Sequence, residues 1–237
     1  MLSRLLTMGA GLSLLVASST AMALPNAMSS VFDVSRNGLS LGYLKSTLTF
    51  KGNKYQYHKS TRATGFAKLL TGAKITEKSE GLFSGDRVIP TSYLYDEVVR
   101  KDQRLDKASF AKGRAVGAYK GKSYNLAVPA NVLDRGILEM VVANDLNRKL
   151  PTLNYTVLDR GELKDYSFVR EGSEKLTTNA GTFDTVKISV KRGDGSRETT
   201  YWMAKQLDFL PVKMLHKEKG DEISSVLREY TSLEKKP

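Results

Sequence analysis

Turn signals recur along this chain at short intervals, and the segments between them alternate polar and apolar residues. Asn37-Gly38 separates "VFDVSR" from "LSLGYL", and Asn-Gly is the strongest short hairpin signal because both turn positions need a positive φ. In "TFDTVKISVKR", Val186, Ile188 and Val190 point to one side and the polar residues between them to the other. Such runs joined by tight turns predict a mainly β fold, a single antiparallel meander that keeps one face dry.

Two segments depart from this pattern. In "LSLGYLKSTLTF" the apolar phase changes at Gly42, which predicts a β-bulge or a sharp bend there. The segment "AKITEKSEGLF", residues 73–83, is mostly polar on both faces. We expect it to be a solvent-exposed stretch of sheet or an edge strand.

One amphipathic helix is expected at residues 131–147. Leu133, Ile137 and Met140 share a helical face, and Asn131 is a favourable N-cap. A lone helix must bury its apolar side, so we expect it on the concave face of a strongly curved sheet or open barrel. A shorter segment, "TGFAKLLTG" at residues 64–72, is expected to form one or two helical turns that expose Phe66, Leu69 and Leu70.

The first residues read as an export signal. A short basic start, an apolar run and the small-x-small triplet ending at Ala23 predict a cleavable signal peptide at residues 1–23. Residues 24–237 would then be a single β-rich domain in a bacterial periplasm. No later segment is long enough to span a membrane, so a membrane-spanning protein is not expected.

Charge is distributed unevenly. Residues 24–130 carry 18 Lys and Arg against 8 Asp and Glu, whereas residues 131–237 carry 18 against 17. The asymmetry favours an acidic partner, which for an exported protein would be a lipid or an anionic envelope polymer rather than a nucleic acid. A generally basic, solvated sheet face explains the same pattern and remains the alternative.

Catalytic motifs are missing from the sequence. It has no Gly-x-Ser-x-Gly elbow, P-loop, dinucleotide fingerprint, zinc helix or cysteine. The two histidines, His58 and His216, lie far apart in the sequence. We therefore expect no enzyme activity, no cofactor and no metal site, although carboxylates distant in sequence could still meet in the fold.

Aromatic residues are the candidate ligand-binding side chains. Tyr93 and Tyr95 share a strand face by their spacing, and Trp202 is the only tryptophan. Aromatic rings suit a ligand groove because they combine large apolar area with a polar group. Ordinary sheet packing of the same three residues is the alternative.

The most specific stretches carry a family resemblance. The runs "GTFDTVK" and "YWMAKQLDFLPVKM", together with "FDVSRNGLSLGYL", resemble the bacterial family called domain of unknown function 3108. The resemblance extends over nearly all of residues 24–237 and implies an exported β-rich protein. It implies no activity and no catalytic residues.

Three functions are compatible with these features. The leading hypothesis is a non-enzymatic envelope protein that binds an amphipathic or anionic molecule. The alternative is a protein-binding factor in envelope assembly or maintenance, docking through an exposed strand edge or the Phe66–Leu70 segment. A hydrolase without a recognisable motif is the third.

Overall fold

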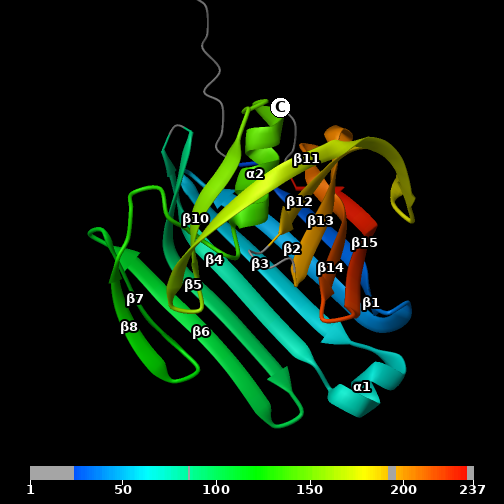
Figure 1. The fold of residues 1–237 in the computed structure, drawn as a ribbon, viewed down its shortest axis with the longest axis horizontal. Helices are drawn as coiled ribbons and strands as arrows, with labels where there is room; N and C mark the ends of the chain where they lie inside the picture. The colour runs from blue at the N-terminus through cyan, green and yellow to red at the C-terminus, as the bar shows by residue number, and fades with distance from the viewer. Residues whose placement is uncertain (1–23, 85, 192–195, 234–237) are drawn as a thin grey trace, which may run out of the picture.

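A computed structural model describes residues 24–84, 86–191 and 196–233 (Figure 1). The expected signal peptide at residues 1–23 lies outside the described residues. The helices are α1 (Gly65–Thr71), α2 (Leu138–Asn147) and the short 3₁₀ turn η1 (Lys205–Leu207). The strands are β1 (Met28–Arg36), β2 (Leu39–Lys51), β3 (Lys54–Ala63), β4 (Lys74–Ser84), β5 (Arg87–Val99), β6 (Asp102–Ala111), β7 (Arg114–Tyr119), β8 (Lys122–Ala127), β9 (Leu133–Asp134), β10 (Leu153–Asp159), β11 (Glu162–Thr178), β12 (Gly181–Lys191), β13 (Arg197–Ala204), β14 (Leu210–Glu218) and β15 (Asp221–Ser232).

The strands form one curved sheet that does not close on itself. Its order is β8-β7-β6-β5-β4-β3-β2-β1-β15-β14-β13-β12-β11-β10-β9. Strands that are consecutive in the chain are neighbours in the sheet, except β8 and β9, which form its two edges, and the N-terminal strand β1 pairs with the C-terminal strand β15 in the middle of the sheet. All the pairings are antiparallel apart from the short parallel contact between β9 and β10. The predicted antiparallel, strongly curved fold is therefore confirmed.

The turn and bulge predictions near the N-terminus also hold. Asn37 and Gly38 have φ values of 50° and 78° and connect β1 to β2. Opposite Gly42 the register shifts between Val34 and Ser35, so a bulge lies there. A Cβ on Gly42 would stand 2.0 Å from the carbonyl oxygen of Arg62, which is why only glycine fits.

Helix α2 packs inside the curved sheet, as expected, but it begins later than predicted. It spans Leu138–Asn147, and residues 131–137 instead form a turn and the short strand β9. Ile137 is the N-cap residue in place of the expected Asn131, and its N–H donates a hydrogen bond of 3.0 Å to the Asp134 carboxyl just before the helix. Pairing with β10 satisfies the backbone at Leu133 and competes with an earlier helix start.

Residues 73–83 were wrongly expected to be solvent-exposed or an edge. Strand β4 lies between β3 and β5, deep within the sheet. The side chains of Glu77 and Ser79 are buried on its concave face. Part of the polar character of this strand therefore belongs to the interior of the molecule, whereas Lys74 and Lys78 are exposed.

Helix α2 fills one end of the curved sheet, here called the closed end (Figure 1). Its buried residues join a core with Leu48, Tyr55 and Leu153. The opposite end is called the open end and is formed by α1 and the hairpin turns at residues 37–38, 100–101, 160–161 and 219–220. Neither α1 nor α2 has the length and apolar composition needed to cross a membrane.

Candidate ligand-binding cavity

Two cavities lie between α2 and the open end. Their volumes are about 430 Å³ and 270 Å³, so together they fall within the range of small-molecule sites. They are called here the first and the second cavity. Both are lined by Lys59, Glu77, Tyr95, Glu139, Tyr201 and Met214, so they meet at these six residues.

The second cavity is largely apolar, whereas the first combines an apolar wall with many charged side chains. Along β12 and β13 the alternation directs every second side chain inward, which places apolar side chains against the hollow. The first cavity is walled by Phe168, Ile188, Val190 and Met203. The second cavity is walled by Phe32, Leu44, Ile75, Leu210 and Ile223.

A cluster of four charged residues stands where the cavities meet. This charge cluster consists of Lys59 on β3, Glu77 on β4, Arg135 before α2 and Glu139 in its first turn. The Lys59 ammonium lies 2.8 Å from the Glu77 carboxylate and 3.3 Å from that of Glu139. Arg135 approaches Glu77 at 3.4 Å. Two cations and two carboxylates balance one another, which limits the cost of burying them.

Within the charge cluster, the neighbouring cations strongly favour the ionised form of Glu77. Burial alone would raise the pKa of Glu77, but Lys59 and Arg135 outweigh it and lower that pKa to about 2. The carboxylates Glu77 and Glu139 also accept hydrogen bonds from Tyr93 and Tyr57, at 2.8 Å and 2.6 Å. Glu77 therefore stays ionised near neutral pH and is a poor general acid.

Arginines extend the site towards the open end. Arg135 also pairs with the buried Asp159 at 3.4 Å. The residue after Asp159 in the chain is Arg160. Arg160 and Arg197 line both the first cavity and an outer hollow of about 520 Å³. Lys122 and Lys164 are further cations of that outer hollow, and Glu162, which pairs with Lys164, is its carboxylate, so the first cavity leads into a mouth of net positive charge, called here the basic mouth.

The family model for "Protein of unknown function (DUF3108)" matches residues 31–223. The chain belongs to this family. A comparison with curated proteins gives no match for the chain.

Two solved structures are similar to this DUF3108 chain. One is a β-barrel-like protein of domain of unknown function DUF1849 from Brucella abortus, with 9% identity and a TM-score of 0.59. The alignment covers 90% of this chain and 100% of that protein, and the likeness shows a shared fold. The other, from Parabacteroides distasonis, is described as "a putative lipoprotein", with 10% identity, the same coverage and a TM-score of 0.36.

The three predicted aromatic residues occupy different positions in the DUF3108 fold. Tyr95 lines both cavities, and its ring centre lies 4.5 Å from the guanidinium carbon of Arg135. Tyr93 is buried beneath the charge cluster, where it supports Glu77. Trp202 lines neither cavity, because its neighbours Tyr201 and Met203 take the inward positions on β13.

The sequence did not reveal the charge cluster of the DUF3108 hollow. Its members were hidden because Glu77 lies in the strand interpreted as solvent-exposed, and Arg135 and Glu139 lie in or beside the helix. One signal was present: Ile75, Glu77 and Phe83 share a face of β4, so a charge stands between apolar residues of a buried surface.

One arrangement in the DUF3108 cavity looks like a nucleophilic triad. At the mouth of the first cavity the Thr199 hydroxyl shares a hydrogen bond of 2.7 Å with His216 Nδ1. His216 Nε2 lies 3.6 Å from the Glu218 carboxylate, which also pairs with Arg197. Since Arg197 engages the carboxylate, Glu218 is shared between two partners and orients the imidazole weakly.

Proposed function

We propose that this protein is an exported, non-enzymatic envelope protein that binds an amphipathic, anionic molecule in its hollow. The observation that carries the proposal is the continuity between the apolar wall of the first cavity and the basic mouth through Arg160 and Arg197. The signal peptide expected at residues 1–23 supports the periplasmic location.

The chemistry of the hollow suggests how such a molecule would lie. Its apolar chain would occupy the first cavity against Ile188, Val190 and Phe168, where water is displaced from apolar surface. Its acidic head would reach the outer hollow, where Arg160 and Arg197 can pair with a phosphate or a carboxylate. Met214 and Tyr95 would contact the part of the chain that extends into the second cavity.

The absence of an enzyme activity is part of this proposal and has a physical basis. The two carboxylates that line both cavities, Glu77 and Glu139, share Lys59 between them. Because the pKa of Glu77 is about 2, this carboxylate cannot serve as the protonated member of an acid/base couple at neutral pH.

Native mass spectrometry of the protein purified from a periplasmic extract tests the proposal. We expect an added mass of one ligand that extracts into organic solvent, on a chain from which residues 1–23 have been removed. An apo mass that persists after addition of a long-chain fluorescent fatty acid and of envelope lipids would contradict it.

A cavity-filling variant sharpens the test. Val190→Trp places a large ring in the first cavity, and Val169→Trp makes the same change on an exposed position of β11. Titration with the fluorescent fatty acid should show an affinity at least about tenfold weaker for Val190→Trp and unchanged for Val169→Trp. Equal affinities of the two variants would place the ligand elsewhere.

A hydrolase is the second candidate, favoured by the arrangement of Thr199, His216 and Glu218. Generic ester, phosphate and glycan substrates test it at low cost. Turnover by the wild type that disappears in His216→Ala would replace the binding proposal, whereas turnover unaffected by this substitution would show that Thr199, His216 and Glu218 are not its source.

A further inference from the structure

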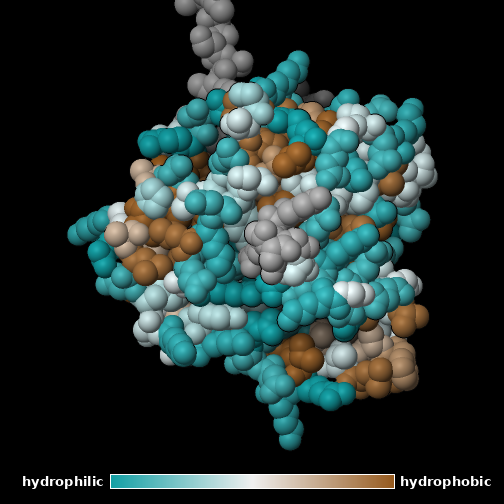
Figure 2. Space-filling view, in the orientation of Figure 1, coloured by the Kyte–Doolittle hydropathy of each residue, from teal (hydrophilic) through white to brown (hydrophobic). Residues whose placement is uncertain are grey.

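Helix α1 displays large apolar side chains to solvent at the open end of the molecule. Phe66 is 74% exposed, Leu69 83% and Leu70 49%, and the helix has no buried residue. Leu39, at the start of the neighbouring strand β2, is 74% exposed. Figure 2 shows the resulting apolar patch at the lower right, over α1. Contiguous exposed apolar surface of this kind marks an interaction site.

The helix is anchored on both sides. The Thr64 N–H donates to the Leu41 carbonyl at 3.0 Å, before the first turn. At the end of the helix, the Arg100 side chain donates a hydrogen bond to the Leu70 carbonyl at 3.0 Å. The backbone N–H of Arg100 donates to the Thr71 carbonyl at 2.9 Å. The apolar side chains are therefore presented by a fixed element of the fold.

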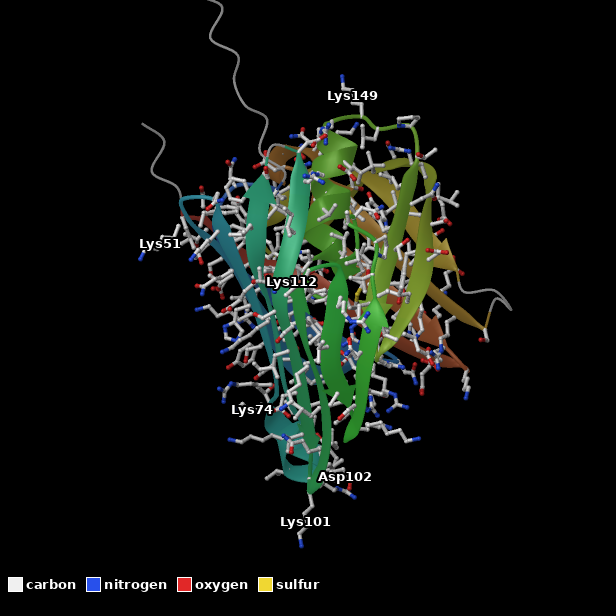
Figure 3. All side chains as sticks on the ribbon, turned by 90° about the vertical axis from the view of Figure 1, so that its left-hand side faces the viewer. Lys51, Lys74, Lys101, Asp102, Lys112 and Lys149 are labelled. Atoms are coloured by element: carbon white, nitrogen blue, oxygen red, sulfur yellow. The ribbon has the colours of Figure 1, made fainter. Side chains whose placement is uncertain are left out.

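Cations surround this patch. Arg62, Lys68, Lys74 and Lys101 are exposed, and none of them forms an ion pair within residues 24–84, 86–191 and 196–233. Figure 3 shows Lys74 and Lys101 at the same end of the molecule, with Asp102 as the labelled acid there. Apolar residues within a basic surround complement an anionic lipid bilayer, whose headgroups attract the cations while its acyl boundary accepts the apolar side chains.

The patch also lies next to the second cavity. Helix α1 connects β3 to β4, and Thr61 and Ile75, which flank it on these strands, both line that cavity. A bilayer contacting α1 would therefore lie at the entrance of the hollow.

We propose that α1, with Leu39 and the cations Arg62, Lys68, Lys74 and Lys101, is a docking surface for an anionic phospholipid bilayer. The proposal deepens the proposed function, because the docked bilayer would exchange the amphipathic ligand with the second cavity. We favour a bilayer over a protein because exposed apolar side chains beside these cations are the composition of a membrane-surface helix, and because a bilayer needs no shape complementarity.

Co-sedimentation with vesicles tests the docking without requiring any cavity ligand. The probes are vesicles of 30 mol% phosphatidylglycerol in phosphatidylcholine, and vesicles of phosphatidylcholine alone. We expect the wild type to bind the anionic vesicles about tenfold more tightly than the neutral ones, with the difference reduced at high salt. Phe66→Ser combined with Leu69→Ser, and separately Lys68→Glu combined with Lys74→Glu, should each weaken binding about tenfold.

Matched controls separate the docking surface from general effects of charge and hydropathy. Val116→Ser with Val169→Ser removes two apolar residues that are 51% and 61% exposed elsewhere. Lys51→Glu with Lys54→Glu makes the same charge change at the β2–β3 turn, at the other end of the molecule from Lys74 (Figure 3). Both controls should bind anionic vesicles as the wild type does.

Several outcomes would overturn the docking proposal. They are no sedimentation of the wild type at low salt, equal binding to both vesicle types, or equal loss in the controls. A photo-crosslinker at position 69 that captures a protein rather than lipid in intact cells would also overturn it, in favour of a protein partner. The variant Val190→Trp should still bind vesicles, so failure of the cavity and failure of the docking surface remain distinguishable.

Discussion

Glu77 is the residue on which the interior charges converge, since it contacts Lys59, Arg135 and Tyr93. Glu77→Gln leaves both cations incompletely paired in a buried site, and we expect a loss of about 3 kcal/mol in the free energy of unfolding. Urea unfolding measures it. The control Glu80→Gln changes a half-buried carboxylate on the same strand and should cost less than about 0.5 kcal/mol. Similar losses of unfolding free energy for both variants would contradict the conclusion that the buried ion pairs depend on Glu77.

The same residue gives a dependence on pH. Lys59 and Arg135 lower the pKa of Glu77 to about 2 in spite of its burial, below the value of about 4.3 expected in an unfolded chain. A depressed pKa in the folded state stabilises the protein above the unfolded value, and the stabilisation is lost as the pH falls from about 5 to 2. Glu77→Gln should lack this part of the acid transition.

At the scale of residues, turns and bulges were predictable from the sequence, but contacts between residues far apart in the sequence were not. The sequence indicated the Asn37-Gly38 turn and the Gly42 bulge because each depends on backbone geometry at one place. The contact of Lys59 with Glu139 depends on the curvature of the sheet and on the position of α2, since 80 residues separate them. No local pattern contains that information.

At the scale of elements, α2 depends on Asp134, a fully buried carboxyl that also accepts a hydrogen bond of 2.6 Å from Ser79. Burial raises the pKa of Asp134 to about 7. A carboxyl with a raised pKa binds its proton more tightly in the folded state, so its contribution to stability weakens as the pH rises from about 4 to 7. Asp134→Asn keeps an acceptor for the Ile137 N–H but does not titrate.

The stability of Asp134→Asn relative to the wild type should therefore increase between pH 4.5 and pH 7.5. Urea unfolding at the two pH values measures the change, and Asp165→Asn, on an exposed residue, is the control. A difference between variant and wild type that stays constant across this range would show that Asp134 does not titrate there.

Element types were more predictable than element boundaries. Alternation identified the strands, and α1 was found with its exposed side chains as expected. The predicted start of α2 was too early. The spacing of Leu133 and Ile137 matches a helical face, but in the structure they belong to β9 and to the turn after it. Their burial in the core satisfies the apolar pattern without a helix at that position.

At the scale of the whole molecule, the pairing of β1 with β15 makes the basic N-terminal half and the nearly neutral C-terminal half parts of one sheet. The charge cluster spans both halves, because Lys59 and Glu77 come from one and Arg135 and Glu139 from the other. Part of the positive charge of residues 24–130 lies around α1, because Arg62, Lys68, Lys74 and Lys101 all belong to this half of the sequence.

This shared sheet predicts that residues 24–237 unfold as one unit. Trp202 reports on the C-terminal half, whereas far-UV circular dichroism reports on all the strands. The two urea transitions should coincide, because separating β1 from β15 opens the sheet and the charge cluster together. A fragment of residues 24–130 would expose Leu48, Tyr55 and Tyr57, which pack in the core formed with α2, and should not fold alone. Two separate transitions, or a folded fragment with a cooperative transition of its own, would instead mean that the chain holds two independent domains.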